Sequence, residues 1–385
     1  MSYYSNSRNK EIRYQVVVFN ATREALAVYD DLVEVSYRKQ CNTIGMAVLT
    51  VPEGHPILDL LEDDMVINIY LGVPDSNSMS SPGNYIWRQH WVFDYEGLYR
   101  DRQITTDADG NIYYLLFFPS MMEILSRYIV AWPAGVDFRS IFHTYPMAQT
   151  LNMVIRRNCT SEATAASGRL RTATVIRNLA YTGHASGSAI ASYTAGTRNV
   201  LELMQELAPL CNFDFDVVPE WTFPGNYIFK QYAGQLGTDK SATVVFDLAL
   251  DNLGAANMYG DRLREKTVAI VGGAGTGEDR TYVIRTGDNY SATNDYEVFV
   301  DASTETDTAT LEDLGDARLG ELKATAKINA SIIASLGYVY RQHYNHGDLV
   351  TVQIGDVSVV RKIDAVDVTF SQNQRVDVRL EFANP

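Results

Sequence analysis

Apolar and polar residues alternate along most of the first third of the chain. The alternation starts at Ile12 and returns after each turn-like stretch, over residues 12–18, 33–37, 46–50 and 87–95. A period of two predicts strands with one buried face. Asp109-Gly110 separates two further apolar stretches, and this dipeptide favours the positive φ angles of a tight hairpin. We therefore predict an antiparallel meander over residues 1–130 that closes, or nearly closes, into a β-barrel.

Two segments interrupt the predicted strands of this meander. Pro56 stands before Ile57 and Leu58 and predicts a short helix, because proline is tolerated in a first helical turn. The stretch Pro74–Asn84 is rich in Ser, Asn, Pro and Gly and predicts a flexible hairpin loop.

The middle of the chain, residues 131–258, changes to helical spacing. Ser120 and Glu123 have the spacing of a capping box and predict a helix that leads into this region. Further helices are predicted after Pro146 and over Asn199–Ala208, and the latter runs into strands at Phe213–Val217 and Tyr227–Phe229. Residues 160–197 predict either a long excursion with little regular structure or an extended hairpin. We predict an inserted α+β region.

The last region, residues 259–385, returns to strands. Strands are predicted at Lys266–Val271 and Arg280–Arg285, and an acidic loop then leads to a long helix over about 310–336, capped by Thr310. Period-two patterns resume and predict strands at 338–340, 349–354, 357–370 and 375–382. The predicted fold is thus mainly β, with two antiparallel barrels, each with a helix, and an α+β insertion.

Charge and cysteine content narrow the class of protein. The 385 residues carry 32 Lys and Arg against 47 Asp and Glu, a net charge of −15, so no overall positive field draws the chain to DNA or anionic lipid. Cys41, Cys159 and Cys211 lie far apart and form neither a disulfide framework nor a CxxC pair, which indicates folding in a reducing cytoplasm. No apolar run predicts a signal peptide or a membrane span.

Several stretches invite a catalytic or binding interpretation. Gly272–Gly277 could cradle a phosphate, but a strand follows it where a nucleotide site needs a helix, so a hairpin connection is predicted. His343 and His346 have a spacing that would place them on opposite faces of a strand, with no third ligand nearby. Asp107, Asp109 and Asn111 alternate as in a calcium loop, but the distal Glu of such a loop is missing.

Three other candidates are equally weak. Gly183–Gly187 does not match the G-x-S-x-G pattern of a nucleophile elbow. A pair such as Asp63 and Asp94 is expected by chance among 47 acids, and Asp214 and Asp216 have the spacing of a solvated strand face. We therefore predict no catalytic, cofactor-binding or metal-binding residues, no cofactor and no enzymatic activity.

The order of local patterns resembles the tail-hub, or baseplate-hub, family of long-tailed bacteriophages. The resemblance spans almost the whole chain and departs from the family at 160–197 and 286–308. The segments that carry it are Ile44–Pro52, Val66–Tyr70, Ile124–Gly135, Arg198–Ala208, Val244–Asp247 with Asp251–Leu253, the Gly-rich turn before Arg280, and His343–Val352 with its Tyr-x-x-Gly-Asp-x-Val-x-Val pattern.

The resemblance implies a structural virion protein. Two tube-type barrels per chain would form six barrels in a homotrimer, which adapts a sixfold tail tube to a threefold tip and forms or gates the channel for DNA ejection. Its implied partners are the tail tube or distal tail protein above, tip, fibre or spike proteins below, and tape-measure protein and transiting DNA in the lumen, without specific nucleic-acid binding. A receptor- or carbohydrate-binding module with an exposed aromatic platform, and a cell-wall hydrolase, are the alternative functions.

Overall fold

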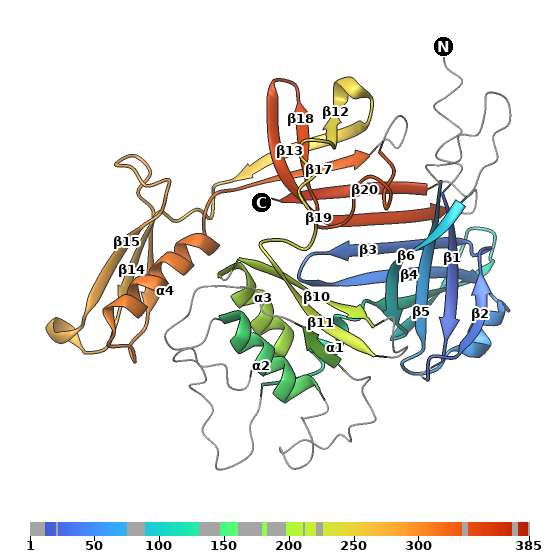
Figure 1. The fold of residues 1–385 in the computed structure, drawn as a ribbon, viewed down its shortest axis with the longest axis horizontal. Coiled ribbons are helices and arrows are strands. Elements are labelled where there is room, and N and C mark those ends of the chain that lie inside the picture. The colour runs from blue at the N-terminus through green and yellow to red at the C-terminus, as the bar shows by residue number, and fades with distance from the viewer. Residues whose placement is uncertain are drawn as a thin grey trace.

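A computed structural model describes residues 12–20, 22–74, 89–130, 147–160, 179–182, 198–210, 212–220, 226–332, 338–371 and 376–383. Strands dominate these ranges, as predicted, and they form four sheets. Figure 1 shows the two larger sheets on one side, the helices α2 and α3 below them, and a smaller α/β unit that projects from the body.

The largest sheet has ten strands and joins the two ends of the sequence. Its main order is β13-β17-β20-β19-β3-β4-β8-β7, and β18 extends it by pairing with β19 and β12. The antiparallel pair β3–β19, with Tyr37 opposite Val368, connects the N-terminal and C-terminal strands. The strands are β3 Glu34–Gln40, β4 Thr43–Pro52, β7 Asp101–Thr106, β8 Ile112–Pro119, β12 Val245–Asp247, β13 Leu253–Asp261, β17 Thr325–Ile332, β18 Leu349–Ile354, β19 Val357–Ser371 and β20 Val376–Ala383.

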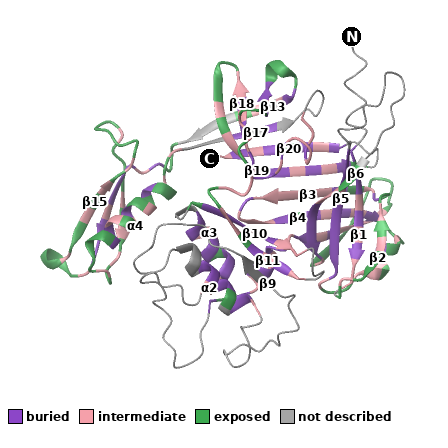
Figure 2. Cartoon of the chain, viewed as in Figure 1, coloured by how far each residue is buried: buried purple, intermediate pink, exposed green. Residues whose placement is uncertain are grey.

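A four-stranded sheet, ordered β2-β1-β5-β6, packs against the large one. It consists of β1 Arg13–Phe19, β2 Ala25–Tyr29, β5 Val66–Pro74 and β6 Gln89–Leu98, and the predicted short helix is the 3-10 turn η1 Pro56–Leu60. The predicted alternation appears as buried and less buried positions along strands such as β1 and β20 (Figure 2). Val16, Ile67, Val368 and Phe382 belong to one hydrophobic cluster, so strands from both ends of the sequence share a core.

The inserted region has a separate core. Its elements are α1 Glu123–Ser126, α2 Met147–Cys159, β9 Leu179–Thr182, α3 Val200–Leu210, β10 Phe213–Pro219 and β11 Tyr227–Ala233. The helix α3 and the β10–β11 hairpin confirm the prediction, and Asn199 caps α3 by accepting from the Leu201 amide at 2.9 Å. The predicted capping box is wrong: the Ser120 hydroxyl accepts from the Gly45 amide at 3.0 Å, and α1 has only four residues.

A second small unit is inserted between β13 and β17. Its sheet has the order β15-β14-β16, from β14 Val268–Gly272, β15 Tyr282–Thr286 and β16 Glu297–Asp301, and α4 Thr308–Glu321 covers one face. Ala269, Val271, Leu311 and Leu319 form its core. The short 3-10 turns η3 Leu248–Leu250 and η4 Gly277–Asp279 complete the elements. The sequence pattern did not predict this separate unit.

The long helix predicted over about 310–336 is wrong in its second half. Asp307, rather than Thr310, caps α4 by accepting from the Thr310 amide at 3.0 Å, and the helix ends at Glu321. Residues 325–332 form β17, which pairs with β13 on one side and β20 on the other. This long-range pairing overrides the local helix preference of an Ala-rich stretch.

One smaller prediction is also wrong. Residues 338–340 do not form a strand but enter a turn in which Tyr340 bridges Tyr344. The strand β13 spans the proposed boundary between residues 258 and 259. The predicted loop at 75–84 and most of the excursion at 160–197 lie outside the described residues. Within the described part of the chain, no helix is long and apolar enough to span a membrane.

Candidate functional site

A pocket of about 160 Å³ lies where the N-terminal strands, the insertion and the C-terminal region meet. Charged groups that are buried between elements fix the positions of those elements, because separating them leaves a charge without its partner in a poorly solvated place. The charged and ionisable groups in its lining are Lys39, Asp94, Glu96, Asp216, Arg341 and His346.

Asp94 on β6 is the centre of the ion pairs in this pocket. Lys39 Nζ lies 3.0 Å from Asp94 Oδ1, and the Tyr37 hydroxyl donates to Oδ2 at 2.6 Å. From the C-terminal region, the Tyr340 hydroxyl donates to Oδ1 at 3.1 Å, and Arg341 Nε lies 3.2 Å from the same oxygen. Burial favours the neutral acid, but the charges of Lys39 and Arg341, with the hydrogen bonds from Tyr37 and Lys39, outweigh it and hold the pKa of Asp94 below its ordinary value. An ionised carboxylate therefore links three separate segments.

Glu96, two residues further along β6, joins the N-terminal strands to the insertion. The Tyr227 hydroxyl on β11 donates to Glu96 Oε1 at 2.8 Å. The Arg23 guanidinium contacts both groups, and it also lies over the Phe19 and Tyr227 rings. Glu96 is almost fully buried, so this cluster seals the interface between β6 and the insertion.

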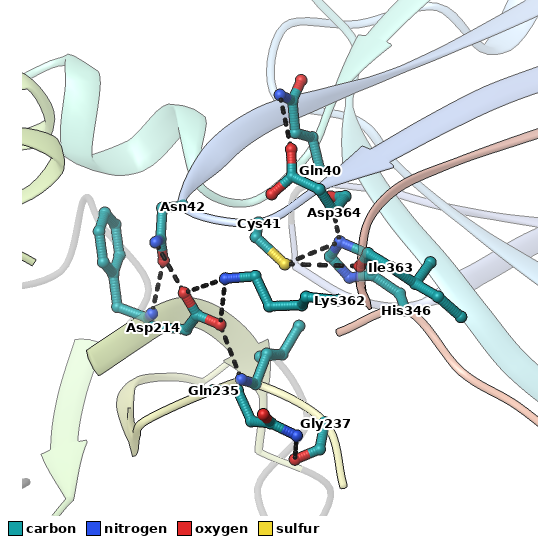
Figure 3. A network of polar contacts seen from close by, with 12 residues as sticks. Gln40, Cys41, Asn42, Asp214, Gln235, Gly237, His346, Lys362, Ile363 and Asp364 are labelled. Carbon is teal, nitrogen blue, oxygen red and sulfur yellow. Dashed lines mark hydrogen bonds and ion pairs between the residues drawn. The ribbon is translucent and has the colours of Figure 1, made fainter. Parts of the chain in front are cut away.

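Asp214 on β10 holds the insertion to the large sheet (Figure 3). Lys362 Nζ on β19 lies 3.1 Å from each carboxylate oxygen of Asp214. Asn42, at the β3–β4 turn, donates to Oδ1 of Asp214 at 2.9 Å and accepts from the Phe215 amide at 2.8 Å. Asn42 has a φ of 56°, a left-handed conformation that asparagine tolerates better than most residues.

The prediction that Asp214 and Asp216 lie on a solvated strand face is therefore wrong. Asp214 is only 3% exposed because the β10–β11 hairpin packs against the β3–β4 turn. Asp216 lines the pocket, where burial raises its pKa to about 6 although Lys39 opposes the shift. Spacing along one strand could not reveal this, because the covering surface comes from other parts of the chain.

His346 lines the pocket, and Cys41 lies beside it, with Cys41 Sγ 3.4 Å from His346 Nε2 (Figure 3). Burial, with a smaller effect from Lys39, lowers the pKa of His346 to about 3. Burial also raises the pKa of the Cys41 thiol well above its ordinary value. Both groups are therefore neutral near pH 7, and the pair lacks the thiolate–imidazolium character of a catalytic cysteine.

The Gly-Asp pair of the Tyr-x-x-Gly-Asp pattern has a structural role. Asp348 accepts from the Thr238 amide at 2.8 Å and the Asn345 amide at 2.7 Å, and Lys240 Nζ lies 3.0 Å from its carboxylate. Gly347 has a φ of +85°, and a Cβ there would lie 2.7 Å from the Leu236 side chain. The pair fixes the segment that leaves the insertion against the start of β18.

The other candidate residues mostly have the predicted structural roles. Gly272–Gly277 connects the antiparallel strands β14 and β15, as predicted. Asp107 accepts from the Asp109 and Asn111 amides at 2.9 Å each, which confirms a turn. His343 accepts from the Val339 amide at 2.8 Å, and Gly183–Gly187 lies outside the described residues.

Asp63 is exposed whereas Asp94 is buried. Among the described residues, no group of three or more His, Cys, Asp and Glu side chains could hold a metal ion. The sequence reasoning missed Asp94 and Glu96 as organising residues. One feature of the sequence could have indicated their role: these two acids interrupt an aromatic strand, β6, which also carries Trp91, Phe93 and Tyr95.

Two of the exposed surfaces in the described part of the chain belong to sheets. All six residues of β7, the edge strand of the large sheet, are exposed. The face of β14–β16 opposite α4 carries Tyr282, Ile284 and Phe299, which are 53%, 65% and 54% exposed. A solvent-facing sheet surface is ordinarily polar, so exposed aromatic and aliphatic side chains indicate contacts with other molecules.

Three solved structures of tail proteins share this fold. The 43 kDa tail protein of prophage MuSo2 from Shewanella oneidensis is 12% identical, with a TM-score of 0.60 over 97% of this chain and 98% of that one. A tail protein from Neisseria meningitidis MC58 is 9% identical, with a TM-score of 0.55 over 97% of both chains. Prophage tail protein gp18 from Listeria monocytogenes EGD-e is 11% identical, with a TM-score of 0.52 over 96% of this chain and 94% of that one.

This chain therefore shares its fold with these tail proteins. The family model of the Siphovirus ReqiPepy6 Gp37-like protein matches residues 15–383, and the chain belongs to that family. No protein with a curated description matches the sequence. The family match and the fold confirm the predicted resemblance and the mainly β class.

Proposed function

We propose that the chain is a trimeric tail hub that adapts a sixfold tail tube to a threefold tip and forms or gates the channel for DNA ejection. The observation that carries this proposal is the ten-stranded sheet that runs through β3–β19 and ends in the fully exposed strand β7. An edge strand with unpaired backbone groups is suited to pairing with another chain.

The buried charged groups around Asp94, Glu96 and Asp214, which we call the buried junction, suit a protein that bears mechanical load. The ion pairs of Asp94 and Asp214 bind the insertion and both ends of the sequence into one body. A hub built this way moves as a unit with the tube above it, whereas three loosely tethered regions would not. We keep the division into residues 1–130, 131–258 and 259–385 as a proposal for its tube-like barrels and inserted region.

The acidic composition of the chain suits a channel through which DNA passes. With a net charge of −15, carboxylates that face the lumen repel DNA phosphates, so DNA slides through without stable binding. The proposed partners are the tail tube or distal tail protein, tip, fibre or spike proteins, and tape-measure protein. The exposed apolar face of β14–β16 supports contacts with such proteins, and we propose no enzymatic role.

The mass of the oligomer and its symmetry test this proposal. Light scattering of the purified chain is expected to give three times the 43.0 kDa of one chain, and electron microscopy a ring with a central channel. A monomer at every concentration, or a dimer without a channel, contradicts the hub. A ring with a neutral or basic lumen contradicts only the electrostatic part.

A further inference from the structure

A groove of about 970 Å³ lies at the base of the small unit formed by β14–β16 and α4, within the range of about 300 to 1,000 Å³ that is typical of small-molecule sites. We call it the linker groove, because the two segments that connect this unit to the large sheet border it. Its lining consists of Arg262, Leu263 and Glu265 from the first linker, Ala324 from the second, and Asn289, Ser291, Thr293, Asn294 and Tyr296 from the β15–β16 loop.

A buried carboxylate organises the linker groove. The side chain of Glu265 is only 2% exposed; it accepts from Arg262 Nε and from Asn289 Nδ2, each at 2.9 Å. These two hydrogen bonds lower the pKa of Glu265, with the larger effect from Asn289, so the carboxylate stays ionised. The guanidinium and the amide are therefore held in place before any ligand arrives, which reduces the entropy lost on binding.

The loop that forms the far wall is fixed in the same way. Asn294 Nδ2 donates to the Asn289 carbonyl at 2.9 Å, and the Thr267 hydroxyl donates to the Asn294 carbonyl at 2.7 Å. The Tyr296 amide donates back to the Thr267 hydroxyl at 2.9 Å. This anchoring leaves the Tyr296 side chain 55% exposed beside the groove, as an aromatic surface with a fixed backbone.

Positive charge is concentrated at the linkers. The side chain of Arg262 is 62% exposed, and among the described residues its only ion pair is the one that its Nε forms with Glu265. None of Arg264, Lys266 and Lys323 forms an ion pair with a described residue, and Lys266 and Leu322 join the two linkers through a backbone hydrogen bond of 2.9 Å. Unpaired cations are unexpected in a chain with 15 more acids than bases, even though Asp288 and Asp295 of the loop are exposed nearby.

The chemistry of the lining favours a particular kind of ligand. A guanidinium with free Nη groups binds carboxylate or phosphate in a bidentate manner. Amide and hydroxyl side chains exchange hydrogen bonds with neutral hydroxyl groups, and an exposed tyrosine ring offers an apolar surface with a polar edge. A nucleic acid would need a cationic track along several phosphates, and the net charge of −15 repels such a polyanion.

We propose that the linker groove binds a saccharide that carries a carboxylate or phosphate group. Arg262 binds the acidic group, the amides and hydroxyls of the loop bind the sugar hydroxyls, and Tyr296 packs against the sugar ring. The tail component would thereby hold an acidic glycan through its projecting unit. This site is independent of the trimer and of the channel.

Ligand-observed NMR and calorimetry on the full chain test this inference with four probes: glucuronic acid, glucose 6-phosphate, glucose and inorganic phosphate. The two acidic sugars are expected to bind at millimolar concentration or below, about tenfold tighter than glucose or phosphate. Arg262→Met is expected to weaken the acidic sugars at least tenfold and to leave glucose unchanged. Tyr296→Ser is expected to weaken all three sugars.

Matched variants separate the site from general surface effects. Arg379→Met removes a guanidinium that is 69% exposed on β20, and Tyr282→Ser removes a ring that is 53% exposed on the same small unit. Neither is expected to change binding. Failure of both acidic sugars to bind, or full retention of binding in Arg262→Met, overturns the site. Equal binding of glucose overturns the acidic preference, and equal binding of inorganic phosphate overturns the saccharide. These outcomes leave the oligomeric state, and so the hub proposal, untouched.

Discussion

Replacing Asp94 by Asn tests whether its buried ion pairs hold the N-terminal strands to the C-terminal region. The substitution keeps the shape of the side chain but removes its charge, which leaves Lys39 and Arg341 beside a neutral amide. Both cations are mostly buried, with side chains 21% and 24% exposed. Breaking a buried ion pair by neutralising one partner costs about 3–5 kcal/mol. The expected loss of unfolding free energy for Asp94→Asn lies in this range.

Asp301→Asn is the matched control. Asp301 also pairs with an arginine, Arg280, but its side chain is 61% exposed, so solvent screens the interaction. An exposed pair contributes about 0–1 kcal/mol. Urea unfolding, followed by intrinsic fluorescence for the sheets and by circular dichroism for the helices, compares the two variants with the wild type. A large shift of the midpoint is expected for Asp94→Asn alone.

The pH dependence gives a second readout. Because the folded-state pKa of Asp94 is lowered, its contribution is complete above the ordinary carboxyl pKa of about 3.9 and is lost as the pH falls toward the folded value. The stability difference between the wild type and Asp94→Asn should therefore shrink in acid. If the unfolding free energy of Asp94→Asn lies within about 0.5 kcal/mol of the wild-type value at pH 7, the ion pairs of Asp94 do not hold these regions together.

Three further predictions concern single positions. Gly347→Ala is expected to destabilise the chain by about 1–3 kcal/mol, because alanine disfavours the φ of +85° and its Cβ would meet Leu236; unchanged thermal unfolding contradicts this. Asp216→Asn is expected to be more stable than the wild type above pH 6 in urea titrations. Because the pKa of Asp216 is raised to about 6 in the folded chain, ionisation of Asp216 lowers the stability of the wild type progressively between about pH 4 and 6. Equal or lower stability of Asp216→Asn above pH 6 refutes the raised pKa of Asp216. Cys41 is expected to resist thiol reagents in the folded chain and to react after unfolding, because it is buried and neutral at pH 7; fast native labelling would show an accessible thiolate.

Much of the local structure follows from patterns that a few neighbouring residues determine. The β7–β8 hairpin turns at Asp109-Gly110, where Gly110 has a φ of +85°, and α3 begins after its Asn199 cap. Such features depend on backbone preferences and on amphipathic periods that lie within one segment. The prediction failed where a distant strand decided the outcome, as at 325–332, which became β17 between β13 and β20.

The buried junction could not be read from the sequence for a related reason. Asp94, Asp214 and Asp216 look like ordinary solvated acids along their own strands. In the folded chain, Lys39 and Arg341 pair with Asp94, and Lys362 pairs with Asp214, from elements far away in the sequence. A single sequence does not specify which carboxylate meets which cation, because that pairing requires the sheets and the insertion to be assembled first.

By itself, the sequence determined the mainly β class, most strand positions, the tight turns and the resemblance to phage tail hubs, because alternation and turn chemistry are local. The tertiary structure alone decided that β3 pairs with β19, that a small unit branches off between β13 and β17, and that acids on β6 and β10 are buried. Those outcomes depend on which surfaces cover one another, and burial of a charge is stable only where the folded chain places its counter-charge.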